Sequence, residues 1–185
     1  MNTFLKKLLA ILFVIALGIL GYLYFGTDTF KSRLSPQDTV TFKMNDLELE
    51  VFYNRPSKRG REIFGALVPF DEVWRTGANE ATTFKTNQKL IIKGKSLPAG
   101  NYTLWSIPND TLWTVIFNSK QYPWGVDETM KPMRIEEYDV LNVLVKPKEI
   151  DDSIEQFTIG FDNSTSKVFL TLAWDNTKIE IPIEQ

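Results

Sequence analysis

Side chains suited to chemistry are concentrated between residues 53 and 80, in the stretch YNRPSKRGREIFGALVPFDEVWRTGANE. It holds four of the chain's six arginines, and Arg55, Arg59 and Arg61 fall within seven residues. Guanidinium groups at this spacing can hold a phosphate, sulfate or carboxylate through paired hydrogen bonds. The alternative is a solvated loop in which these arginines form ion pairs with nearby carboxylates. Those carboxylates are Glu62, Asp71, Glu72 and Glu80.

A second candidate is the heptapeptide WRTGANE, residues 74–80. In a ligand pocket beside Trp74, Arg75 binds an anion and Asn79 donates and accepts hydrogen bonds. Glu80 then orients the ligand or accepts a proton. In the structural alternative, Arg75 and Glu80 form a buried pair that ties a crossover loop to the sheets, and removing one partner costs about 3–5 kcal/mol. Both alternatives perturb the same groups, so the sequence does not separate them.

The composition excludes several reaction types. The chain has no cysteine and no histidine, so thiol catalysis, disulfides, Ser-His-Asp triads and the usual zinc sites cannot be built. Paired carboxylates remain available for hydrolysis, and Glu80 with Asp71 or Glu72 could act as a glycosidase-like acid and base. A turn-capping role for Asp71 and Glu72 fits their position better. We therefore assign no catalytic residue.

Metal, cofactor and nucleic-acid binding are not expected. One dense group of carboxylates, within residues 149–155, has the composition of a solvated loop and not of an oxygen-ligand metal site. No glycine pattern typical of nucleotide binding occurs. The formal net charge is −2, which gives no general attraction to nucleic acid.

Five tryptophans raise the question of an aromatic platform, for example for a sugar. We expect Trp113 and Trp174 in the core, which is the common place for large aromatic side chains. Trp74, Trp105 and Trp124 are candidate walls beside the arginine stretch.

The amino terminus predicts a membrane anchor. After Lys6 and Lys7, residues 8–26 carry no charge, and as a helix this run spans about 28 Å, close to the hydrocarbon thickness of a bilayer. It has no polar face, and its length, aromatic end and lack of a clean cleavage site favour an uncleaved anchor over a signal peptide. The expected order is a basic segment (1–7), the helix (8–26), a tether (27–38) and one domain (39–185). The domain is expected in the periplasm or cell exterior, and secreted if the leader is cleaved.

Period-two alternation predicts a mostly β body. Residues 40–44 and 47–53 form the expected first hairpin, with one solvated face. A short helical turn is expected at 61–66. Further strands are expected at 82–92, 102–107, 112–117, 140–145, 157–161, 168–174 and 178–183. Many short strands with turns and no long amphipathic helix are typical of an antiparallel β-sandwich.

The pair of strands at 102–107 and 112–117 carries the strongest pattern. A four-residue loop would place Leu104 opposite Val115 and Tyr102 opposite Phe117. The face that carries these four residues and Trp113 is expected in the core. The opposite face, which carries Trp105, is expected to be partly open.

Three blocks resemble an uncharacterised bacterial family, number 2911 among the domains of unknown function. They are YNRPSKRGREIFGALVPFDEVWRTGANEATTF, LPAGNYTLWSIPNDTLWTVIFN and LAWDNTKIEIPI. The resemblance implies a secreted or membrane-anchored, mostly β domain with no assigned activity, and it supplies no catalytic residue.

Three functions are compatible with these residues. The first is a membrane-anchored binding or interaction module, whose partner besides the membrane is a small anionic or carbohydrate ligand or an envelope protein. The second is a histidine-free hydrolase of envelope carbohydrate. In the third, the arginine and glutamate network only stabilises the fold. The candidate ligand-binding residues are Arg55, Arg59, Arg61, Trp74, Arg75, Asn79 and Glu80.

Overall fold

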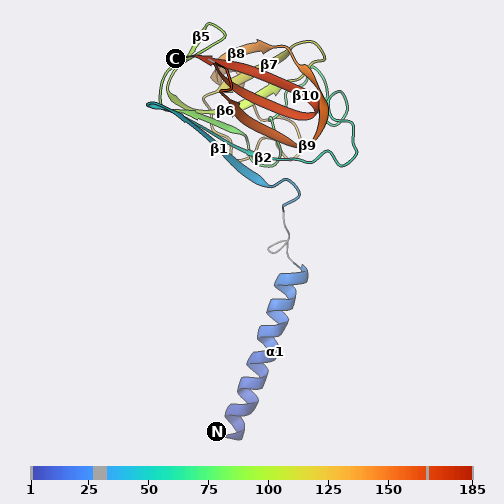
Figure 1. Cartoon of the computed structure of the whole chain (residues 1–185). Coiled ribbons are helices and arrows are strands. Elements are labelled where there is room, and N and C mark those ends of the chain that lie inside the picture. The colour runs from blue at the N-terminus through green and yellow to red at the C-terminus, as the bar shows by residue number, and fades with distance from the viewer. Residues whose placement is uncertain (1, 27–32, 166, 185) are drawn as a thin grey trace. The chain divides into compact units, whose positions relative to one another are not determined.

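The computed structural model describes residues 2–26, 33–165 and 167–184. The chain divides into two compact units, Met1–Arg33 and Leu34–Gln185, which are described separately. In the first unit, helix α1 (Thr3–Gly26) is long and apolar enough to cross a membrane, and none of its residues is buried (Figure 1). The expected helix is confirmed, although it begins at Thr3 and includes both lysines.

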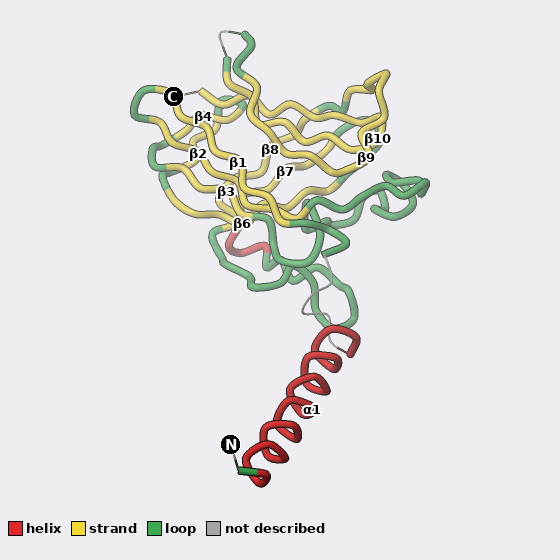
Figure 2. The backbone as a smooth tube through the Cα atoms, turned by 60° about the horizontal axis from the view of Figure 1, so that its bottom comes forward, coloured by secondary structure: helices red, strands yellow, loops and turns green. Residues whose placement is uncertain are grey.

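The second unit is an antiparallel β-sandwich, as expected (Figures 1 and 2). One sheet has the strand order β1-β2-β3-β6-β7-β8 and the other has the order β5-β4-β10-β9. The strands of the first sheet are β1 (Gln37–Met44), β2 (Leu47–Asn54), β3 (Thr83–Thr86), β6 (Gly100–Ile107), β7 (Trp113–Asn118) and β8 (Asp139–Val145). Those of the second are β4 (Leu90–Ile92), β5 (Lys95–Leu97), β9 (Lys148–Asp162) and β10 (Val168–Glu184). A short 3-10 helix, η2 (Glu136–Tyr138), lies just before β8 of the first sheet.

Several boundaries differ from the expected ones. Strand β1 already begins at Gln37, within the expected tether, of which residues 27–32 lie outside the described residues. The strand expected at 82–92 is two strands in different sheets, because the chain turns at Asn87, whose side chain bonds the β1–β2 turn. Strand β9 includes residues 149–155, which were expected to form a loop. Strand β10 joins two expected strands through a bulge at Asp175 (φ 52°).

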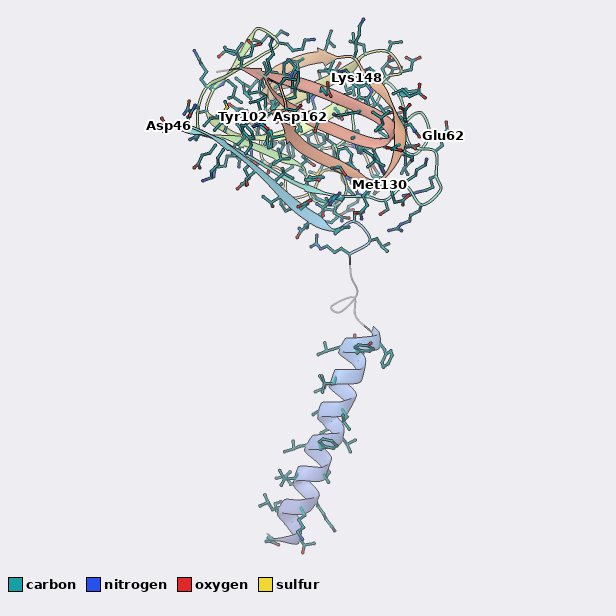
Figure 3. The ribbon with its side chains drawn as sticks, viewed as in Figure 1. Asp46, Glu62, Tyr102, Met130, Lys148 and Asp162 are labelled. Atoms are coloured by element: carbon teal, nitrogen blue, oxygen red, sulfur yellow. The ribbon has the colours of Figure 1, made fainter. Side chains whose placement is uncertain are left out.

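The main core lies between the two sheets, where side chains fill the space (Figure 3). Alternate residues of β2 from Leu47 to Tyr53 are buried, as the period of two requires. Trp113 and Trp174 are also buried there, as expected. Because every buried apolar side chain of the described chain lies between Leu47 and Ile183, we expect residues 34–185 to fold without the helix.

The hairpin of β6 and β7 has a different register from the expected one. Leu104 lies opposite Phe117, and Ser106 lies opposite Val115, because the loop is longer than expected and is capped by the side chain of Asn109. The shift is two residues, which keeps each side chain on its expected face.

The outer face of this hairpin is closed, which corrects the expectation of a partly open face. Trp105 is fully buried in a second, smaller apolar cluster with Ala81, Ile116 and Tyr122. The rings of Trp105 and Tyr122 meet edge to face at 5.4 Å. Residues 119–138, which link β7 to β8, therefore cover this face of the sheet. In Figure 2 the longest loops of the body gather at one end of the strands.

Candidate functional site

Residues 55–82 connect β2 to β3 and close one edge of the sandwich. Ser57 forms an isolated antiparallel bridge with Gln156 of β9. The Lys58 amide donates to the Glu155 carbonyl oxygen at 2.7 Å, and the Phe157 amide donates to the Pro56 carbonyl oxygen at 2.9 Å. The segment thus leaves one sheet and continues along the edge of the other. Residues 61–66 form turns and not the expected helical turn.

Arg55 joins the two sheets through its half-buried guanidinium group. Its Nε donates to the Phe157 carbonyl oxygen at 3.3 Å, one terminal nitrogen donates to Thr158 Oγ1 at 3.0 Å, and the other pairs with Asp38 Oδ2 at 3.3 Å. Since Asp38 belongs to β1 and the other two acceptors belong to β9, this side chain acts as a cross-link within the protein.

Three more of the candidate residues bond the same piece of chain, residues 34–38, which we name the entry segment because it leads into β1. Arg59 donates to the Leu34 carbonyl oxygen at 2.9 Å. Asn79 donates to the Ser35 carbonyl oxygen at 3.5 Å, and Glu80 accepts from Gln37 Nε2 at 3.1 Å. Together with Arg55, these residues attach the entry segment to the sandwich.

Arg61 bonds the backbone of its own loop. Its guanidinium group donates to the carbonyl oxygens of Ser57 at 2.6 Å and Lys58 at 2.9 Å. Nearby, the Lys58 ammonium forms an ion pair with Asp175, which also accepts from Ser153 at 2.8 Å. Burial alone would raise the pKa of Asp175, but the bonds from Lys58 and Ser153 outweigh it, so the pKa lies below its ordinary value.

Arg75 is in a different situation. Within the part of the chain that the structure describes, its guanidinium group makes no hydrogen bond or ion pair, and its Nε is buried. Burial lowers the pKa of Arg75, yet the group remains charged at neutral pH. The pair of Arg75 with Glu80 that the sequence allowed is not formed.

Arg75 lines a hollow of about 320 Å³. The described lining residues are Leu67, Val68, Pro69, Glu72, Val73, Trp74, Arg75, Val126, Met130 and Pro132. Eight of these ten side chains are apolar, and the other two are Glu72 and Arg75. Leu67 and Met130, which is labelled in Figure 3, are 43% and 67% exposed, so part of the lining is in contact with solvent.

The backbone on both sides of Arg75 is held tightly. Trp74 and Ser106 exchange two backbone hydrogen bonds at 2.7 and 3.0 Å, which attach this segment to the end of β6. Thr76 is buried with φ 54°, a value that a β-branched residue rarely adopts. Its carbonyl oxygen accepts from Thr82 Oγ1 at 2.8 Å. These bonds fix the backbone from which the side chain of Arg75 extends.

Gly125 allows the neighbouring loop to pass directly over Arg75. A Cβ atom added at Gly125 would lie 2.6 Å from Cδ of Arg75 and 2.7 Å from its Cβ. The Gly125 amide also donates to the Asn79 carbonyl oxygen at 3.4 Å. This glycine is therefore required for the close approach of the loop that supplies Val126 and Met130 to the hollow.

The three candidate wall tryptophans differ in their surroundings. Trp74 is half-buried, stacks on Trp174 with ring centroids 6.0 Å apart, and also lines the hollow. Trp105 is fully buried and cannot form a wall. Trp124, next to Gly125, is 44% exposed.

The carboxylates considered for hydrolysis bond different partners. Asp71 accepts from Asn109 Nδ2 at 2.8 Å in a turn, and Glu80 accepts from Gln37. Glu72 lines the hollow beside Arg75. Among the described residues no group of three or more acidic side chains could hold a metal ion.

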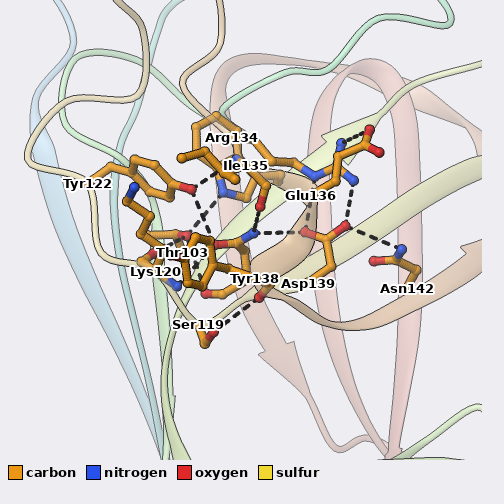
Figure 4. Close-up of polar contacts among 12 residues, drawn as sticks. Thr103, Ser119, Lys120, Tyr122, Arg134, Ile135, Glu136, Tyr138, Asp139 and Asn142 are labelled. Carbon is orange, nitrogen blue, oxygen red and sulfur yellow. Dashed lines mark hydrogen bonds and ion pairs between the residues drawn. The ribbon is translucent and has the colours of Figure 1, made fainter.

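A further polar network holds the loop of residues 119–138 in place, and sequence reasoning missed it (Figure 4). The side chains of Arg134 and Asp139 form an ion pair and are only 7% and 10% exposed. Asn118 donates to Asp139 at 2.8 Å, and Tyr122 OH accepts from the Ile135 amide at 3.0 Å. The sequence signal was an arginine five residues before an aspartate at the start of a strand.

Comparison with known proteins gives one match. Residues 35–183 match the model of a family described as protein of unknown function, DUF2911. The chain belongs to this family. No curated protein and no solved structure matches. The resemblance seen in the sequence is thereby confirmed, and the description of DUF2911 assigns no role to any residue.

Proposed function

We propose that this DUF2911 protein is a membrane-anchored, extracytoplasmic binding module, in which Arg75 binds an anionic ligand. The observation that supports the proposal is the state of Arg75, which lines a mostly apolar hollow and whose guanidinium group has no protein partner among the described residues. The charged group is half-buried and has no protein partner of opposite charge among the described residues. An anion in the hollow would supply such a partner through a charge-assisted hydrogen bond.

The other candidate arginines are better explained by the stability of the domain. Arg55, Arg59 and Arg61 already donate to backbone or side-chain oxygens, so a ligand would have to compete with those bonds. We therefore assign the entry segment and its partners to the structure of the domain. Ligand binding is assigned to the hollow beside Arg75, with Trp74 as its aromatic wall.

The anchored, extracytoplasmic location rests on helix α1. Its composition suits a bilayer span or a signal sequence, and Lys6 and Lys7 at its amino-terminal side favour a cytoplasmic amino terminus. The absence of cysteine is compatible with an oxidising compartment, where a free thiol would be oxidised. Cleavage of the sandwich by protease added to spheroplasts would support this orientation, and protection would contradict it.

A thermal-shift experiment on residues 34–185 tests the binding function. The probes are acetate, benzoate, phosphate and sulfate at matched ionic strength, because a ligand that prefers the folded state raises Tm. We expect at least one anion to raise the Tm of the wild type and to have no such effect on Arg75→Gln. The unliganded Tm of Arg75→Gln should be nearly unchanged, since the wild-type side chain makes no hydrogen bond that could be lost.

Arg61→Gln is the matched control, because Arg61 is an exposed arginine outside the hollow. It should keep the full anion response. The proposal would be refuted if every anion acted equally on the wild type and on Arg75→Gln. Unfolding of the Arg75→Gln variant would instead support a purely structural role for this arginine.

A further inference from the structure

The lining of the hollow restricts the chemical class of the ligand. It contains one guanidinium group and one carboxylate, from Arg75 and Glu72, and eight apolar side chains. A sugar exposes many hydroxyl groups, each of which needs a hydrogen-bond partner when it is buried. Among the described lining side chains, only the two charged ones offer such partners freely, since the indole N–H of Trp74 already donates to the Gly77 carbonyl oxygen. A carbohydrate would therefore leave most of its hydroxyl groups without a side-chain partner.

The charges also favour a single negative charge on the ligand. The formal charge of Arg75 is balanced by that of Glu72 on the same lining. A carboxylate brings one negative charge and two coplanar oxygens, which match the two parallel N–H bonds of a guanidinium group. A phosphate monoester brings up to two negative charges at neutral pH, and Glu72 would repel the second charge.

We infer that the hollow binds a small amphipathic monocarboxylate, with its carboxylate on Arg75 and its apolar part against Trp74, Val126 and Met130. This inference rests on the proposed function and specifies its ligand. A volume of about 320 Å³ lies at the lower end of the range for small-molecule sites, about 300–1,000 Å³. The apolar part is therefore short, such as a six-carbon chain or one aromatic ring.

Two sources can supply this chemistry. One is a free short-chain or aromatic acid, and the other is the terminal carboxylate of a peptide that ends in an apolar residue. Both place one carboxylate next to one apolar group. A peptide and its amide distinguish the two sources, because the peptide and the amide differ only in the terminal charge.

Methionine methyl groups offer a direct probe of the hollow. Met130 lines it, whereas Met44 lies at the end of β1 and is absent from its lining, so Met44 serves as an internal reference. The full chain, labelled at its methionine methyl carbons, is placed in lipid nanodiscs and titrated by NMR. The probes are hexanoate, benzoate, hexanol, hexyl phosphate, N-acetylglycylleucine and the amide of that peptide. Hexanol has the same chain as hexanoate and reports partition into the bilayer.

We expect hexanoate or benzoate to shift the Met130 signal in a saturable manner and to leave the Met44 signal in place. Hexanol and hexyl phosphate should bind at least about tenfold more weakly, and Arg75→Gln should weaken hexanoate binding by about tenfold or more, as expected for loss of a charge-assisted pair. An unchanged Met44 signal in Arg75→Gln shows that the variant is folded. Tighter binding of the peptide acid than of hexanoate, with loss in its amide, assigns the carboxylate to a peptide terminus. The opposite order assigns it to a free acid.

Two results would overturn the inference, and they have different meanings. If hexyl phosphate bound more tightly than hexanoate and still required Arg75, the carboxylate class would be wrong but the anion-binding function would stand. If no probe shifted Met130, or if Arg75→Gln responded like the wild type, the anion-binding function would fail together with the inference.

Discussion

Two regions of this domain use the same functional group in opposite ways. In residues 55–61 the guanidinium groups of Arg55 and Arg61 donate to oxygens of the protein. Twenty residues after Arg55, Arg75 lines a mostly apolar hollow, and its guanidinium group bonds no oxygen of the described residues. The same guanidinium group therefore bonds the protein in residues 55–61 and is left unbonded at Arg75. The difference comes from the atoms that surround each side chain.

The difference follows from what each region packs against. Residues 55–61 run along the edge of β9 and beside the entry segment, where carbonyl oxygens that are not used within a sheet are within reach. Most of the walls around Arg75 are apolar side chains, of leucine, valine, proline, methionine and tryptophan. The one carboxylate among the described lining residues, that of Glu72, forms no ion pair with Arg75. Arg55, at the sheet edge, is therefore a cross-link, whereas Arg75, among mostly apolar side chains, is not.

The largest expected effect is that of Arg55→Met. This change removes three side-chain hydrogen bonds that join β1 to β9, and hydrogen bonds to charged groups contribute about 1.5–3 kcal/mol each before compensation. We expect the free energy of unfolding of residues 34–185 to fall by about 3 kcal/mol in urea titrations. A loss below about 0.5 kcal/mol would remove the contrast between the two regions.

A smaller loss is expected for Gly125→Ala, which acts on the other region. The new Cβ atom would overlap with the Cβ and Cδ atoms of Arg75, and overpacking of this kind typically costs about 1–3 kcal/mol. We expect a loss of about 2 kcal/mol in the same titrations, together with weaker anion binding. Gly160→Ala is the control, since its added Cβ would lie 3.4 Å from Thr171 Oγ1, an ordinary contact. Equal effects of the two substitutions would contradict the close approach to Arg75.

Acid should lower the free energy of unfolding by removing the ion pair between Asp175 and Lys58, which lies in residues 55–61. Its pKa in the folded protein lies below the ordinary value of 3.8, so its contribution is present above that pH and is lost as the pH falls through the folded value. A partly exposed pair of this kind contributes up to about 1 kcal/mol. Urea titrations at several pH values should show the wild type more stable than Asp175→Asn at pH 6, with a difference that shrinks below about pH 4. A difference independent of pH would show that the charge of Asp175 is not involved.

The smallest expected effect is that of Arg61→Gln. Its guanidinium group is exposed and bonds only the carbonyl oxygens of its own loop among the described residues, and surface changes usually alter stability by less than about 0.5 kcal/mol. We expect a change of that size and an unaltered anion response in thermal-shift assays. A large loss would place Arg61 with Arg55 among the cross-links.

Much of the fold could be predicted because it depends on local periodicity. Alternation with a period of two identified the first hairpin and the face of β6 and β7 that lies in the main core, and an uncharged run of helical length identified α1. It did not predict that the opposite face, with Trp105, is buried too. The strand register and the strand boundaries were predicted wrongly where one local pattern is compatible with two structures. The two-residue shift of register between β6 and β7 preserves both faces, and the bulge at Asp175 looks in sequence like a turn between two strands.

The sequence by itself determined the class of fold, the membrane-competent helix and the concentration of arginines between residues 53 and 80, because each depends on residues close together in the chain. Only the tertiary structure decided which of those arginines is already bonded. The acceptors for Arg55 come from Asp38 and from Phe157, 102 positions away along the chain. The wall opposite Arg75 comes from Val126, Met130 and Pro132. Whether a donor is bonded depends on which acceptors lie within about 3 Å of it in the folded chain. The order of residues in the sequence does not give that distance.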